Sequence, residues 1–337
     1  MRSTLCASHH RLVILNRILA VLIFNTSASV AFAQDRLDPG FSANPAIWNA
    51  DEREQAQTFV QTQIERVMTG EESAISRGRA ALVEALTFPG GTDLYVSQLS
   101  ETIAQNLAPA MAADDLIVRV NAMVICTYVD HPDALPAIEN GLKDPNAGVR
   151  YPAANAIANL LAGDGLTNSQ RRDALNTLKD LATREQDAFV VKPMLDALAQ
   201  TQDNALVLDV LNDRVQLHAA QPSVVYDAEA NTLQVVYTRI YTVTNPPADV
   251  VRDLAKVSAR YLKLTAGQLA ENSIPGDRNR SLKNIMNIAA TALRATHEGL
   301  AAPGRAPDRP DPAIQQENWQ RVVNIADEWV GVLQLPP

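Results

Sequence analysis

The chain has little of the material that redox or metal chemistry needs. Its 337 residues include two cysteines, Cys6 and Cys126, and five histidines. In residues 34–337 no two histidines have the three- or four-residue spacing that places two metal ligands on one helical face. The G-x-S-x-G, S-x-x-K and H-E-x-x-H motifs of hydrolases are also absent. We therefore expect no metal, no cofactor and no catalytic residue.

Basic residues are outnumbered by acidic ones. The chain has 38 Asp and Glu against 29 Lys and Arg, for a formal net charge of −9. Such a charge repels phosphate backbones and anionic membrane surfaces, so nucleic acid is not an expected partner.

Long hydrophobic runs are missing as well. The apolar run from Ile18 to Phe24 is shorter than the ~20 residues that a spanning helix needs. It follows Arg2, Arg11 and Arg17 and leads to Ala31-Phe32-Ala33. This pattern predicts a Sec-type signal peptide over 1–33, cleaved after Ala33, rather than an uncleaved anchor. We expect a secreted or periplasmic protein without an integral membrane segment, and the remaining thiol, Cys126, can form no intramolecular disulfide.

Helical periodicity is what the sequence does show, most clearly in residues 130–163. Leu135, Ile138 and Leu142 recur at helical spacing, and Asp144-Pro145 then ends the helix. A second apolar stripe runs from Val149 to Leu161, with Gly163 just beyond it. Residues 130–163 therefore predict one antiparallel helix pair.

The second helix of this pair recurs along the chain. VRVNAMVIC begins at Val118, VRYPAANAI at Val149 and VVKPMLDAL at Val190, at offsets of 31 and 41 residues. Repeats of this size indicate helix pairs that stack to bury their apolar faces. In this alignment Cys126 shares a column with Ile157 and Leu198, which predicts a buried thiol.

These phrases resemble HEAT repeats, in a secreted bacterial type of that family. The resemblance implies an all-α fold, an α-solenoid of stacked antiparallel helix pairs, which we expect over 44–298. It also implies ladders between acidic residues near the end of first helices and basic residues at the start of second helices. Here the matching residues are Asp144 and Arg150.

Three later segments are less regular. Residues 224–244 fit either a helix or a β-hairpin, and we favour the helix because the flanking segments are helical. Residues 299–313 are rich in proline and predict a stiff linker. Residues 314–335 predict a C-terminal amphipathic helix, which either caps the solenoid or binds a partner.

The histidines His131, His218 and His297 fall near predicted helix ends. We expect them to complement the helix dipole or to face water.

The resemblance implies a function as well as a fold. Second helices line the concave surface of HEAT-like stacks, so the expected function is a non-catalytic exported scaffold for a protein or peptide partner. The alternative is an exported enzyme whose site is assembled from distant residues of the repeats and the C-terminal helix. The candidate partner-binding residues lie on two second helices and on the C-terminal helix; they are Tyr151, Asn155, Asn159, Lys192, Asp196, Gln200, Trp319 and Trp329. The sequence does not indicate the oligomeric state.

Overall fold

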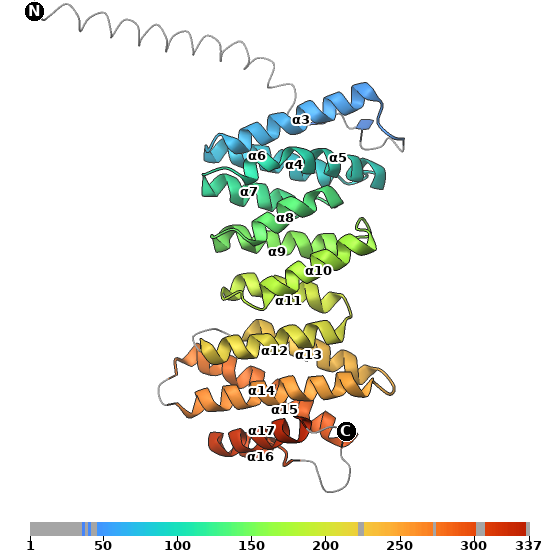
Figure 1. The fold of residues 1–337 in the computed structure, drawn as a ribbon. Coiled ribbons are helices and arrows are strands. Elements are labelled where there is room, and N and C mark those ends of the chain that lie inside the picture. Colours follow the sequence, from blue (N-terminus) through green and yellow to red (C-terminus); the bar gives the residue numbers. More distant parts are fainter. Residues whose placement is uncertain are drawn as a thin grey trace, which may run out of the picture. The chain divides into compact units, whose positions relative to one another are not determined.

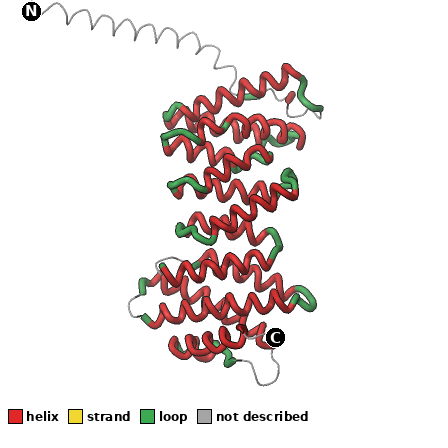
Figure 2. The backbone as a smooth tube through the Cα atoms, in the orientation of Figure 1, coloured by secondary structure: helices red, strands yellow, loops and turns green. Residues whose placement is uncertain are grey.

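The computed structural model describes residues 36–37, 40–41, 46–221, 226–271, 274–300 and 307–334. The predicted signal peptide and residues 301–306 of the predicted linker lie outside these ranges. The described residues form helices and no strand, which confirms the all-α prediction (Figure 2). No helix among them is both long and apolar enough to cross a membrane. The chain divides into two compact units, Met1–Val129 and Asp130–Pro337.

The first unit is built around its longest helix. α3 (Ala50–Met68) packs on α4 (Glu72–Leu86) and α5 (Asp93–Asn106). α4 also packs on α7 (Leu116–Cys126). The short helix α6 (Ala108–Met111) lies between α5 and α7 in the sequence. Gly78 lets α4 approach α3 closely, because a Cβ at this position would lie 2.5 Å from the carbonyl oxygen of Gln63. Cys126 is fully buried at the end of α7, as its repeat column predicts.

The second unit stacks helix pairs in two layers (Figure 1). In the layer of first helices, α8 packs on α10, α10 on α12 and α12 on α14; in the layer of second helices, α9 packs on α11, α11 on α13 and α13 on α15. This is the α-solenoid arrangement that the repeats predict. The first helices are α8 (Leu135–Leu142), α10 (Asn168–Ala182), α12 (Asn204–Ala220) and α14 (Ala248–Ala270); the second helices are α9 (Ala147–Ala162), α11 (Ala188–Gln200), α13 (Asp227–Thr242) and α15 (Gly276–Leu300).

Local sequence sets the start of these helices. The side chains of Asn146 and Asp187 accept hydrogen bonds from backbone N–H groups in the first turns of α9 and α11. Thr167 and Gln170 form a capping box at the start of α10. Each cap satisfies N–H groups that have no partner within the helix.

The segment 224–244, for which helix and hairpin were both open, contains helix α13, and the favoured prediction is confirmed. Its buried residues Leu233, Val236 and Ile240 follow the helical period. α13 packs on the second helices α11 and α15, so the alternation of first and second helices continues through this segment.

The C-terminal helix packs on the stack. α17 (Trp319–Gln334) begins later than predicted, because the chain first forms the short helix α16 (Asp311–Gln315) and then turns at Glu317, which has a positive φ of 51°. Val322, Ile325 and Ala326 are buried, and α17 contacts α14 along its length. In this structure α17 therefore covers α14, as the capping alternative predicts.

Candidate functional site

Two neighbouring second helices carry the predicted partner-binding residues at matching positions. Tyr151, Asn155 and Asn159 of α9 match Lys192, Asp196 and Gln200 of α11, each pair 41 residues apart. Because α9 and α11 pack side by side, the matching positions lie on the same side of the two helices. We call these six residues, together with Phe189, the α9–α11 face.

This face is open to solvent. Tyr151 is 48% exposed and Phe189 is 79% exposed. Asn159, Lys192 and Gln200 are exposed, while Asn155 and Asp196 are half-buried. Phe189 was not predicted as a site residue, although its place one turn before Lys192 could have indicated it. The structure thus brings six of the eight predicted residues together and adds an exposed aromatic side chain.

The charged groups of the face bind each other. Lys192 Nζ lies 2.5 Å from Asp196 Oδ2, one helical turn further along α11. The amide nitrogen of Asn155 donates to the carbonyl oxygen of Tyr151 at 3.1 Å. The face therefore offers aromatic and amide groups for contact rather than net charge.

Two prolines change the backbone next to these residues. Pro152 and Pro193 lie inside α9 and α11 at matching repeat positions. Because proline has no N–H, the carbonyl groups four residues earlier, those of Gly148 and Phe189, receive no helical hydrogen bond from these positions. Both Gly148 and Phe189 are exposed residues, and their carbonyl groups lack the donor that a residue other than proline would supply at positions 152 and 193.

A cavity of about 800 Å³ opens at the end of the face marked by Gln200. Arg171 donates there to the carbonyl oxygens of Leu161 and Gly163, and Arg239 donates to the carbonyl of Ala199. These guanidinium groups complement the negative C-terminal ends of α9 and α11. The lining residues are Leu161, Ala162, Arg171, Leu175, Ala197, Gln200, Thr201, Gln202, Asp203 and Arg239.

At the opposite helix ends, Arg150 forms an ion pair with Glu185 that the sequence did not predict. Arg150 binds the carboxylate of Glu185 through Nε at 2.7 Å and Nη2 at 3.0 Å, and donates to the backbone carbonyl of Asp144. Burial raises the pKa of Glu185, but hydrogen bonds from Arg150 and from the backbone outweigh burial and hold that pKa below its usual value. The ladder partner is therefore in the following repeat, just before α11.

The two predicted tryptophans lie on α17, which packs on α14 and not on α9 or α11. Trp319 is half-buried, with Lys283 Nζ 5.7 Å from its ring centroid. Trp329 is only 2% exposed, and its Nε1 donates to the carbonyl of Asp308 at 3.4 Å. Since Trp329 contributes to the packing of α17, its side chain is not available to a partner in this structure.

His218 lies in the last turn of α12, at a helix end as predicted, but the alternative that it faces water is wrong. His218 is fully buried, and its Nε2 lies 2.8 Å from Oε1 of Glu229. Arg214 is buried in the same cluster. The spacing of Arg214 and His218, one helical turn apart, was the available signal, but their partner comes from the next helix and no local pattern points to it.

Among the residues that the structure describes, no three side chains of His, Cys, Asp or Glu come together in an arrangement that could hold a metal ion.

One family model and several solved structures are similar to parts of the chain. The family model described as HEAT repeats matches residues 104–199. A designed armadillo repeat protein is 16% identical with a TM-score of 0.35, over 82% of this chain and 100% of that chain. A designed armadillo repeat protein in complex with peptide (KR)4 is 13% identical with a TM-score of 0.36, over 80% and 99%. Kap121p bound to RanGTP is 14% identical with a TM-score of 0.41, over 90% of this chain and 33% of Kap121p. No curated protein matches the chain.

Proposed function

We propose that the protein is a non-catalytic, exported scaffold that binds a protein or peptide partner through the α9–α11 face. The match of residues 104–199 to the family model of HEAT repeats supports the proposal. The observation that carries the proposal is the exposure of two aromatic side chains, Phe189 at 79% and Tyr151 at 48%, on two helices that pack side by side. Large exposed aromatic side chains are enriched at the centres of protein interfaces, where their burial supplies much of the binding energy.

The polar groups of the face suit a partner with its own backbone or amide groups. Asn159 and Gln200 can each donate and accept, and the carbonyl of Phe189 lacks the helical hydrogen bond that Pro193 cannot supply. A partner that buries the aromatic groups can therefore satisfy its own N–H and C=O groups at the same face. Since Lys192 and Asp196 bind each other, we expect affinity to depend only weakly on salt.

Capture of the partner tests the proposal. Residues 34–337 serve as bait, with crosslinking, in an extract of the envelope or the secreted fraction of the source cells. We expect Phe189→Ala and Tyr151→Ala each to weaken capture of a specific partner about tenfold or more, as truncation of interface aromatic residues does. The matched control is Phe88→Ala, because Phe88 is also an exposed aromatic residue, at 41%, but follows α4 in the first unit. A specific partner that both α9–α11 variants retain would contradict the proposal.

Export is tested separately, by sequencing the N-terminus of the protein recovered from cells. Cleavage after Ala33 supports export by a signal peptide. Recovery of the chain with its N-terminal 33 residues intact in the cytoplasm would contradict it.

A further inference from the structure

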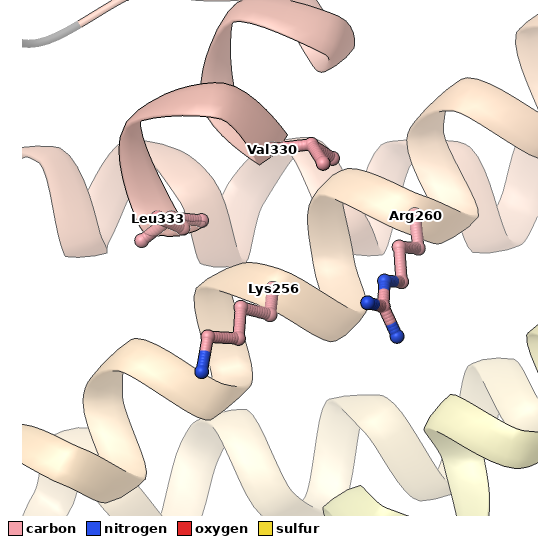
Figure 3. Close-up of a pocket in the computed structure, with 4 residues that line it drawn as sticks. All are labelled: Lys256, Arg260, Val330 and Leu333. Carbon is pink, nitrogen blue, oxygen red and sulfur yellow. The ribbon is translucent and has the colours of Figure 1, made fainter. Parts of the chain in front are cut away.

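A second cavity, of about 310 Å³, lies between α14 and α17 (Figure 3). α14 contributes Lys256 and Arg260, and α17 contributes Val330 and Leu333. Figure 3 shows the basic side chains on one helix and the aliphatic side chains on the other. The cavity therefore has a cationic wall and an apolar wall.

The two cations are neighbours on one helix face. Lys256 and Arg260 are four residues apart, a spacing at which like charges repel each other. The guanidinium of Arg260 bonds to the neutral side-chain amide of Asn212 in α12. An anion held between Lys256 and Arg260 would relieve this repulsion.

The nearby carboxylates neutralise part of this positive charge and leave the charge of Arg260 in excess. Asp253, one turn before Lys256, lies 3.2 Å from its Nζ. Asp327 of α17 is 2.6 Å from Nζ of Lys263, which follows Arg260 along α14. Of the described residues that line the cavity, none is acidic. The cavity thus carries positive charge on a chain whose formal net charge is −9.

We propose that this cavity binds a small aliphatic carboxylate. The carboxylate group lies between Lys256 and Arg260, and the hydrocarbon chain lies against Val330 and Leu333. A guanidinium presents parallel N–H donors that match a carboxylate, and an ammonium adds a second charge-assisted hydrogen bond. The volume is near the lower limit of small-molecule sites, about 300 Å³, which selects a ligand of few carbon atoms.

The aliphatic wall separates this ligand class from inorganic anions. Sulfate or phosphate can use Lys256 and Arg260 but gains nothing from Val330 and Leu333. Each methylene group that leaves water contributes about 0.8 kcal/mol, so a carboxylate with a longer chain should bind more tightly until the cavity is filled.

The ligand should also stabilise the contact between the two helices. It touches α14 and α17 together, and a ligand that binds only the folded protein raises its stability by mass action. The site is independent of the α9–α11 face, so it can exist whether or not that face binds a partner.

Titration calorimetry and thermal unfolding of residues 34–337 with sodium hexanoate test the proposal. We expect saturable binding of hexanoate and a rise in Tm, with hexanamide and sodium sulfate each binding about tenfold more weakly or not at all. Lys256→Gln and Arg260→Gln should each weaken hexanoate binding about tenfold. Lys143→Gln is the matched control, because Lys143 is an exposed lysine at the end of α8, outside both the cavity and the α9–α11 face, and it should leave hexanoate binding unchanged.

Several results would overturn the proposal. These are no saturable binding of hexanoate to the wild-type chain, equal binding of hexanamide, sulfate as tight as hexanoate, or unchanged affinity in both α14 variants. Circular dichroism confirms that the variants fold. A crystal structure of the wild-type chain with hexanoate gives a second readout, in which density between α14 and α17 supports the site and density only elsewhere contradicts it.

Discussion

Glu229 of α13 accepts a hydrogen bond from Nε of Arg214 in α12 at 2.6 Å, and neither side chain has any exposed surface. His218 lies 2.8 Å from the same carboxylate oxygen. Nη1 of Arg214 donates to the backbone carbonyls of Ala182 and Glu185, at 2.5 and 2.9 Å. A single buried ion pair thus connects α12, α13 and the segment that follows α10.

Removing the negative charge of this pair should destabilise the fold strongly. We expect Glu229→Gln to lower the free energy of unfolding by about 3–5 kcal/mol, because Arg214 is left buried without a counter-charge. The measurement is urea unfolding at neutral pH, followed by circular dichroism. Asp209→Asn is the control, since Asp209 is 58% exposed and its pair with Lys179 lies at the surface; it should cost about 0–1 kcal/mol. An equal loss in the free energy of unfolding for the two variants would show that the buried ion pair stabilises the fold no more than the surface pair does.

The same carboxylate predicts a dependence of stability on acid pH. Burial raises the pKa of Glu229, but the hydrogen bond with His218 and the charge of Arg214 outweigh burial and hold that pKa below its usual value. A carboxyl group with a lower pKa in the folded state stabilises the fold above its unfolded pKa of about 4.3, and this contribution disappears as the pH falls through the folded pKa.

Unfolding by urea at pH values from 7 down to 3 measures this dependence. The wild-type protein should lose stability below about pH 4.3, and Glu229→Gln should lose less over the same interval, because glutamine does not titrate. Parallel curves for the two proteins would contradict the prediction.

The repeat architecture could be predicted from sequence because its signals are local. The apolar columns of α9 and α11 recur at a fixed offset, and the buried residues Ile157 and Leu198 occupy one column. The caps Asn146 and Asp187 directly precede these helices. Helical periodicity and helix caps involve residues that are close together in the sequence, so they can be recognised in a single sequence.

Contacts between helices were harder to predict. Arg150 forms its bidentate ion pair with Glu185, 35 residues away, in addition to its contact with Asp144. His218 is buried because Glu229 of the next helix meets it. The spacing of charges within one helix does not show which charge of another helix lies opposite, and the α14–α17 cavity forms only when two segments far apart in sequence pack together.

Cys126 should resist thiol reagents while the protein is folded. Its side chain is fully buried, and burial raises the pKa of the thiol to about 12. The reactive thiolate is therefore scarce and inaccessible at neutral pH. Residues 34–337 contain no other cysteine, so labelling with a chromogenic disulfide reports on this thiol alone. We expect slow labelling of the native protein and complete labelling in denaturant. Rapid labelling without denaturant would mean that α7 opens readily.

The packing of α17 on α14 predicts that Trp329 is a structural residue. Trp329 is 2% exposed, so Trp329→Ala should lower the free energy of unfolding by about 3–5 kcal/mol through loss of burial and formation of a cavity. Val332→Ala is the control on the same helix, because Val332 is 38% exposed and should cost less than about 0.5 kcal/mol. Thermal and urea unfolding measure both variants. If α17 were an arm that leaves the stack to grip a partner, Trp329→Ala would leave the stability of the isolated protein unchanged and weaken partner capture instead.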